Sequence, residues 1–196
     1  PISIEKYQEH KRNKIAKEWE ESFILVDKEL SNIEVYDKKE EIEDLEVIDQ
    51  IDVLEENTKP QLVEKDKNID GILVIDKIDL NLPILKGTNK RNLDTSVTTI
   101  EKTGEKGEIG NYSIAGHRNR RYGSIFNRLD EVDVGDTIDV LDNGIKYTYQ
   151  VDEKLYVKPE DTWVLDSNGK DKEITLVTCH PITNATHRLI IKGKII

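Results

Sequence analysis

The stretch DTIDVLDNGIKYTYQV (136–151) contains two runs rich in β-branched and aromatic residues, separated by Asn143 and Gly144. Asn-Gly is the dipeptide most typical of a two-residue turn between antiparallel strands. The stretch therefore predicts a β-hairpin with strands at 136–142 and 145–151. Five further runs of similar composition predict strands at 71–76, 81–87, 110–117, 173–179 and 187–193.

Helical patterns are short in this part of the chain. Only 91–97 and 124–132 have the composition of short helices, and no helix of 10–15 residues separates the strands. Many short strands would leave unpaired edges in an open sheet, and closure into a barrel removes those edges. The sequence therefore predicts a mainly β protein in which residues 69–196 form a closed or nearly closed β-barrel.

The first 68 residues differ from the barrel region in composition. Residues 4–30 carry apolar side chains at helical spacing, at Ile15, Trp19, Phe23 and Val26. Residues 27–68 hold fifteen acidic residues and six lysines, a net charge of −9. We expect a solvated acidic linker here, and the alternative is an arm that lays its apolar residues across the following domain. The predicted domains are thus a helix with an acidic arm at 1–68, and the barrel at 69–196.

The composition excludes several classes of protein. A formal net charge of −11 argues against nucleic-acid binding, which needs a surplus of Lys and Arg. No run approaches the roughly 18 apolar residues of a membrane span. The single cysteine excludes an internal disulfide and a cysteine zinc site, and it leaves a thiol-redox protein without a resolving thiol. Because the chain has no methionine, we expect the natural protein to begin before Pro1, with a leader segment.

Three residues suited to acyl transfer lie at predicted strand ends. Cys179 ends the apolar run ITLVT, and the following His180-Pro181 cannot continue a central strand. His117 ends the strand SIAGH, whose small residues leave room for a ligand, and Arg188 opens the last strand. Each residue alone is more often structural, as a buried thiol, a packed imidazole or a surface guanidinium. Together they supply the nucleophile, the proton carrier and the oxyanion-binding cation of thioester chemistry.

Two other histidines compete for the proton-carrying role. His180 adjoins Cys179 and His187 adjoins Arg188, but neighbouring residues of a strand point to opposite faces. We therefore expect His117 to carry the proton, so that replacing it by Ala removes activity while His180→Ala leaves most of it.

These residues lie in segments that resemble the bacterial sortases, a family of cysteine transpeptidases. TLVTC at 175–179 resembles the cysteine signature of that family, NYSIAGHR at 111–118 its histidine strand, and HRLIIKG at 187–193 its final strand with an arginine. Residues 82–93 are similar to its early strand and first helix. The resemblance covers 69–196 in order and does not extend into the N-terminal segment.

The resemblance implies a sortase-type barrel of about eight strands and a role for each residue. Cys179 would attack the threonine carbonyl of an LPxTG-like sorting signal and form an acyl-thioester. His117 would protonate the leaving amine and later deprotonate the incoming one, and Arg188 would hold the substrate backbone and the oxyanion. The resemblance also implies three residues that line the peptide groove, namely Ala115, Thr178 and Leu176.

The resemblance further implies the partners and the location. The substrate would be the sorting-signal peptide of a secreted protein, and the acceptor an amine of a cell-wall precursor or of a pilin lysine. The enzyme would anchor surface proteins at the extracellular face of the cytoplasmic membrane of a Gram-positive bacterium, held by a hydrophobic segment. We expect no cofactor; the alternative is calcium bound by Glu101, Glu105 and Glu108, which read more simply as a solvated charged loop.

The subclass stays open at this point. THRLIIKG (186–193) is similar to the ending of pilus-building class C sortases, but 1–68 lacks the Asp-Pro-aromatic lid of that class, which favours a class A- or D-like anchoring enzyme. The acidic arm could occlude the groove by a different contact. A non-catalytic peptide-binding barrel, indifferent to Cys179→Ala, is the alternative of another class. Because a thiol of reference pKa about 8.5 and an imidazole of about 6.5 are both mostly neutral at pH 7, we expect slow turnover and a bell-shaped pH profile.

Overall fold

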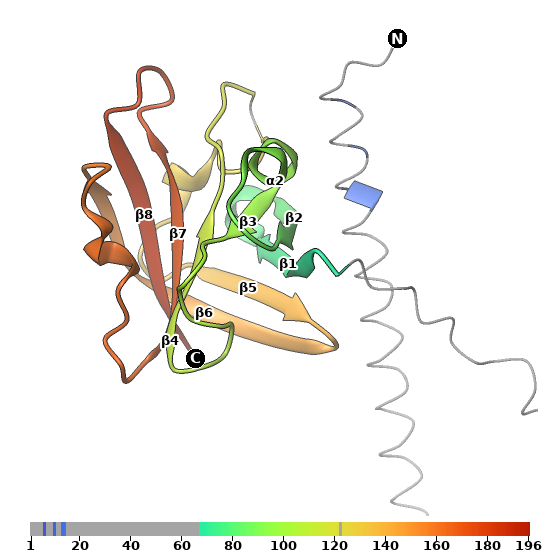
Figure 1. Cartoon of the computed structure of the whole chain (residues 1–196), viewed down its shortest axis with the longest axis vertical. Coiled ribbons are helices and arrows are strands. Elements are labelled where there is room, and N and C mark those ends of the chain that lie inside the picture. Colours follow the sequence, from blue (N-terminus) through green and yellow to red (C-terminus); the bar gives the residue numbers. More distant parts are fainter. Residues whose placement is uncertain (1–5, 7–9, 11–12, 15–66, 122) are drawn as a thin grey trace, which may run out of the picture.

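The computed structural model describes residues 6, 10, 13, 14, 67–121 and 123–196 (Figure 1). Eight strands close into one barrel, in the order β1-β2-β3-β4-β7-β8-β6-β5. The strands are β1 (Ile69–Ile75), β2 (Leu80–Leu85), β3 (Val97–Thr99), β4 (Gly110–Ala115), β5 (Thr137–Asp142), β6 (Ile145–Val157), β7 (Lys172–His180) and β8 (His187–Ile195). The short helices are η1 (Asp76–Ile78), α2 (Lys90–Thr95), η2 (Leu129–Glu131) and η3 (Thr162–Leu165). The predicted mainly β, closed barrel of about eight strands is confirmed.

Alternating apolar side chains fill the barrel. Every second residue of the long strands lies in the hydrophobic core, as Leu73 and Ile75 do in β1, and Leu189 and Ile191 in β8. Each fully buried Leu or Ile contributes roughly 1.5–3 kcal/mol relative to an exposed one. The residues between them face outward, so that a strand end can present a reactive side chain on the outer face of the barrel.

The hairpin of β5 and β6 forms at the predicted turn. Asp142 pairs with Ile145, and Asn143 and Gly144 between them have φ angles of 50° and 75°. A two-residue turn with both central residues in the left-handed region matches the twist of the flanking strands. β6 then continues to Val157 instead of ending at 151, which lets it pair with both β5 and β8.

The predicted helices are only partly correct. The helix expected at 91–97 is α2, which ends at Thr95 because the chain turns into the short strand β3. Asn89 caps its first turn by accepting a hydrogen bond from Asn92 N at 2.9 Å. The helix expected at 124–132 is wrong apart from the three residues of η2. Ile125 has a φ of 48°, which a right-handed helix cannot contain.

Four residues of the N-terminal segment are described. Lys6, His10, Asn13 and Lys14 are helical and exposed, in agreement with the helix predicted there. The remainder of that helix and the acidic arm up to residue 66 lie outside the described residues. Within the part of the chain that the structure covers, no helix combines the length and apolar character that crossing a bilayer requires.

Strand pairing brings three segment ends to one edge of the barrel. β4 and β7 are parallel neighbours, and β7 and β8 are antiparallel neighbours. The carboxyl ends of β4 and β7 and the start of β8 therefore meet at the same edge, which we call the β4/β7/β8 edge. In Figure 1 the loop that follows β4 and the β7–β8 connection both lie at the upper end of the barrel.

Candidate active site

Cys179 and Arg188 are directly paired at the β4/β7/β8 edge. Cys179 lies near the end of β7, Arg188 near the start of β8, and the antiparallel register joins them. Directly opposed residues of an antiparallel pair project to the same face, so the thiol and the guanidinium share the outer face. Both residues are partly buried, and Arg188 Nη1 donates to the carbonyl of His187 at 3.1 Å. The structure therefore brings these two predicted residues together.

His117 reaches the same level from the other side of β7. The parallel register of β4 and β7 pairs Ala115 with Val177, and Gly116 N still donates to Val177 O at 3.1 Å. Continuing this register by two residues, past the last pair of the ladder, sets His117 opposite Cys179. Imidazole, thiol and guanidinium thus follow one another across three neighbouring segments. We call His117, Cys179 and Arg188 the reactive row.

Gly116, directly before His117, serves packing. A Cβ at Gly116 would lie 2.5 Å from Cδ2 of Phe126, a residue that is fully buried. The backbone NH of Phe126 donates to the carbonyl of His117 at 3.1 Å. The space beside Gly116 is therefore occupied by the Phe126 segment, against which His117 is seated.

One carboxylate faces the imidazole of His117. The distance from His117 Nε2 to Asp94 Oδ1 is 3.6 Å, and both side chains are about half exposed. Asp94 belongs to α2 and also accepts a hydrogen bond from Lys90 Nζ at 3.0 Å. The Lys90 hydrogen bond lowers the pKa of Asp94, and a protonated His117 acts in the same direction. Asp94 is therefore ionised at neutral pH and can orient the ring in front of it.

The three predicted groove residues do not share one environment. Ala115 is partly buried on the outer face, in register with the residue before Thr178. Leu176 is fully buried in the core and does not line a groove, so that assignment is corrected. Thr178 is buried on the same inner side, where its hydroxyl donates to Gly116 O at 2.7 Å and holds β4 to β7. Alternation along β7 explains both results, because residues 176 and 178 face opposite to Cys179.

An outward-facing apolar row lies next to the reactive row. In register across four strands, its members are Ala115, Val177, Ile190 and Leu155; Ile190 is fully buried, and the other three are partly buried. Sequence reasoning missed Val177, although its position two residues before Cys179 places it on the same face.

The competing histidines do not face the reactive row. His180 Nδ1 lies 2.8 Å from Nη1 of Arg118, and its ring centroid lies 4.5 Å from that of Tyr156. Burial lowers the pKa of His180, and the positive charge of Arg118 lowers it further. His187 is exposed and its Nδ1 lies 2.9 Å from the hydroxyl of Thr186. His117 remains the histidine that the fold sets opposite Cys179.

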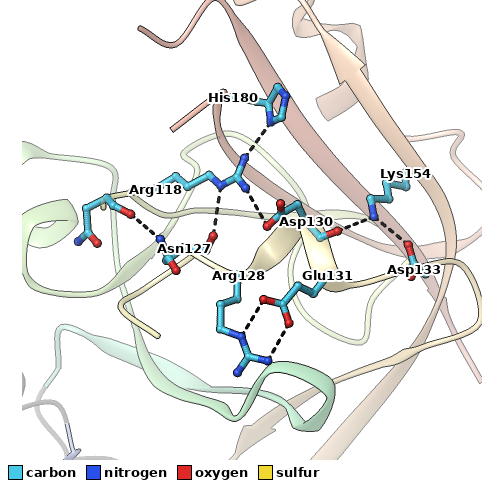
Figure 2. A network of polar contacts seen from close by, with 9 residues as sticks. Arg118, Asn127, Arg128, Asp130, Glu131, Asp133, Lys154 and His180 are labelled. Carbon is cyan, nitrogen blue, oxygen red and sulfur yellow. Dashed lines mark hydrogen bonds and ion pairs between the residues drawn. The ribbon is translucent and has the colours of Figure 1, made fainter. Parts of the chain in front are cut away.

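A polar network on the inner side of this edge was not predicted (Figure 2). At its centre is Arg118, whose side chain is only 3% exposed. It contacts His180, Asp130 and the backbone of Asn127. The sequence signals only that a basic residue follows His117, because nothing local to it shows where the side chain goes.

The calcium hypothesis finds no geometric support. Among the described residues, no three His, Cys, Asp or Glu side chains gather closely enough to hold a metal ion. Glu101, Glu105 and Glu108 are all exposed in the loop before β4.

The comparison with protein families agrees with this geometry. The model of the Sortase domain matches residues 73–196, well over half of the chain. The chain belongs to the sortase family. Members of this family are transpeptidases, which makes the chain an enzyme by membership.

Relatives of several sortase classes are similar to this chain. Sortase A of Bacillus anthracis is 33% identical over 162 residues, covering 82% of this chain and 75% of that protein. Sortase D of Bacillus subtilis is 32% identical over 127 residues, covering 63% of this chain and 62% of that protein. The chain therefore spans less than two thirds of the B. subtilis protein.

Solved sortase structures of different classes are similar to this chain to about the same extent. A sortase D5 transpeptidase of Clostridium perfringens has a TM-score of 0.60 at 34% identity, covering 65% of this chain and 79% of that one. Sortase C1 of Streptococcus agalactiae has a TM-score of 0.64 at 34% identity, covering 70% and 72%. Such similar values show the sortase fold without separating the classes.

Proposed function

We propose that this sortase cleaves an LPxTG-like sorting signal after its threonine and transfers the acyl fragment to an amine. The observation that carries the proposal is the reactive row, in a chain that belongs to a transpeptidase family. The row offers a nucleophile, a proton carrier and a fixed cation within reach of one carbonyl group.

The first half of the reaction forms a thioester. The thiolate of Cys179 attacks the threonine carbonyl carbon, and a C–S bond forms. Arg188 donates hydrogen bonds to the oxyanion, whose negative charge exists only in the tetrahedral state. The C–N bond to glycine then breaks, and the imidazolium of His117 gives its proton to the leaving amine. Thioester and neutral imidazole remain.

The second half resolves the thioester. The acceptor amine attacks the same carbon, and the neutral imidazole of His117 takes the proton that the amine loses. The C–S bond breaks, the new amide is released, and the thiolate and imidazolium are restored. Both halves use the same three side chains, so loss of any one of them should affect cleavage and transfer together.

The apolar row is the proposed floor of the peptide groove. An extended peptide laid across Ala115 and Val177 would bring its scissile carbonyl to the adjacent reactive row. One wall would be η3, because Asn111 of β4 donates to Val164 O at 3.2 Å and ties η3 to the outer face. Trp163 of η3 is 55% exposed and is the aromatic side chain that we assign to the apolar residues of the sorting signal.

The physiological acceptor amine depends on the sortase class, and there are two candidate acceptors. We favour anchoring of surface proteins to a cell-wall amine at the outer face of a Gram-positive cell, as the similarity to sortases A and D supports. Pilin polymerisation through a lysine amine is the second candidate, favoured by the THRLIIKG ending and the likeness to a sortase C1.

Product analysis tests the proposal. An LPxTG-type peptide is incubated with the enzyme and with either triglycine or an Nα-blocked lysine, and the products are separated and weighed by mass spectrometry. We expect cleavage between Thr and Gly, transfer to an amine, and no product with Cys179→Ala. The preferred amine distinguishes anchoring from polymerisation. Product formed equally by Cys179→Ala, or none by any protein across a panel of sorting peptides, would contradict the proposal.

A further inference from the structure

Arg118 is a buried cation next to the reactive row that the proposed reaction does not use. Its Nε donates to Asn127 O at 3.2 Å, its Nη2 lies 2.7 Å from Asp130 Oδ1, and its Nη1 lies 2.8 Å from His180 Nδ1 (Figure 2). An arginine is always a donor, so His180 accepts at Nδ1 and carries its own hydrogen at Nε2. The planar guanidinium thus meets three fixed acceptors at once.

These acceptors belong to segments that are far apart in the sequence. Arg118 follows His117 directly and His180 follows Cys179 directly, and the two contacting residues are 62 positions apart. Neighbours in an extended chain face opposite sides, so Arg118 and His180 meet on the inner side while His117 and Cys179 face outward. A contact on the inner side therefore controls the separation on the outer side.

Backbone pairing stops just before this point. The register of β4 and β7 ends with Ala115 and Val177, followed by the bond from Gly116 N to Val177 O. Beyond Gly116 the chain turns toward η2, where Phe126 N bonds to His117 O. Beyond the end of the ladder, the contact between the side chains of Arg118 and His180 joins the two segments.

The network is itself anchored in the barrel. Lys154 of β6 donates to Asp130 O at 2.7 Å and to Asp133 Oδ1 at 2.8 Å, which fixes the segment that carries the Asp130 carboxylate (Figure 2). The ring of Tyr156, also on β6, packs against His180. Arg118 is thus held from β6, β7 and η2 together.

We propose that Arg118 is a positioning residue, which clamps the end of β4 to the end of β7 and so fixes His117 relative to Cys179. Its charge is matched by Asp130 and directed inward, so it does not act on the substrate. Catalysis depends steeply on such distances, and a misplacement of about 1 Å can cost on the order of 100-fold in rate. The link to turnover rests on the proposed function, but the clamp can be tested without a peptide.

The test uses the chemistry of the only thiol in the chain. Alkylation of Cys179 by iodoacetamide is followed between about pH 5 and pH 10 in the parent, His117→Ala, Arg118→Lys and the double variant. We expect His117→Ala to change the profile strongly in the parent, and much less in the Arg118→Lys background. Such a cycle isolates the coupling between the two positions from the stability that each variant loses. Equal effects of His117→Ala in both backgrounds, or no effect in the parent, would overturn the clamp.

Peptide turnover adds a second readout. We expect Arg118→Lys to lower kcat by about tenfold or more with KM changed less than about threefold, because lysine cannot donate to three acceptors in a plane. Arg120→Lys is the matched control, since Arg120 is exposed two positions away, and it should match the parent. Unchanged kcat in folded Arg118→Lys would overturn the clamp. Failure of every protein on every peptide, with the alkylation coupling intact, would contradict the proposed function alone.

Two variants at His180 test the clamp in the case in which Arg118→Lys does not fold. Glutamine at position 180 keeps an acceptor for the guanidinium and leucine does not, so we expect His180→Gln to keep the His117 coupling and His180→Leu to weaken it. This refines the expectation that His180 is dispensable, because its role is to hold Arg118 and not to move a proton. Identical coupling in these two variants would count against the clamp.

Discussion

Two buried basic residues flank β4, and they differ in what surrounds them. Lys106, before the strand, lies between two carboxylates that are themselves mostly buried, at 3.1 Å from Asp70 and 3.4 Å from Asp142. Arg118, after the strand, has one half-exposed carboxylate, Asp130, and two neutral acceptors. The first arrangement ties together two neighbouring strands, β1 and β5, whereas the second lies beside reactive side chains.

The difference separates stability from chemistry. Burial opposes the charge of Lys106, but Asp70 and Asp142 outweigh it and raise its pKa. Burial and the nearby Asp70 raise the pKa of Tyr112 well above its usual value, so its hydroxyl stays protonated and donates to Asp70 at 2.7 Å. These groups pair with one another and stabilise the barrel, but their burial keeps them away from a ligand. The β4/β7/β8 edge instead keeps His117 and Cys179 open to a ligand.

The largest expected effect is on activity alone. Replacing Cys179 or His117 by Ala should lower peptide cleavage by about 1,000-fold or more, because either change removes a participant in every bond-breaking step. Both residues are partly or half exposed, so the thermal midpoint should stay within a few degrees of the parent. Cleavage assays with matched melting curves measure both quantities. A melting point that falls in step with activity would show that the edge is structural.

The second expected effect is on stability alone. Lys106→Met removes the cation that lies between the Asp70 and Asp142 carboxylates, while Lys86 stays 3.8 Å from Asp70. Breaking a buried ion pair on one side should cost about 3 kcal/mol in the free energy of unfolding. Urea unfolding measures the loss, and the exposed Lys170→Ala is the control. Below the unfolding transition, the kcat of Lys106→Met should equal that of the parent. A large kcat defect in the folded protein would contradict the division between the two clusters.

The third effect depends on pH. A protonated His180 would face the Arg118 guanidinium, and the lowered pKa of His180 means that the folded state binds this proton less readily than the unfolded chain. The contribution is therefore fully present above the unfolded value of about 6.5 and is lost as pH falls through the folded value. The parent should lose more stability than His180→Gln between about pH 7.5 and pH 5, in urea titrations of each. Parallel losses would show that His180 is not linked to folding.

The smallest expected effect concerns Asp94. Its contact with His117 is 3.6 Å long between half-exposed groups, a geometry worth at most about 1 kcal/mol. Asp94→Asn should therefore lower kcat/KM by no more than about fivefold, and the difference should shrink in high salt. Steady-state kinetics at two salt concentrations measure it. A loss as large as that of His117→Ala would promote Asp94 to a catalytic role.

The strands and the reactive row could be predicted because they follow local patterns. The barrel strands could be predicted from the alternation of apolar residues, the Asn143-Gly144 turn and the TLVTC segment. Pairing of β4, β7 and β8 then brings the strand ends that carry the reactive row to one edge. β3 was missed because three residues carry too little pattern to distinguish from the helix before them. The helix prediction at 124–132 was wrong because Ile125 has a positive φ, which the local sequence does not indicate.

Features that depend on distant segments could not be read from the sequence. Leu176 was predicted as a groove residue, but only the folded barrel shows that its face of β7 points into the core. Arg118 joins His180 across 62 positions, and only the folded chain shows that contact. The acidic arm up to residue 66 lies outside the described residues, so its role in occluding the groove stays a prediction. Deleting residues 1–68 should then raise peptide cleavage, and no change would contradict it.

The most direct test of the reactive row is the intact mass of the enzyme after brief mixing with an LPxTG-type peptide. The account predicts an adduct of the peptide fragment that ends at threonine, carried on Cys179, absent from Cys179→Ala and removed by hydroxylamine, as a thioester should be. An adduct located on another residue, or peptide cleavage without any thioester at Cys179, would contradict it.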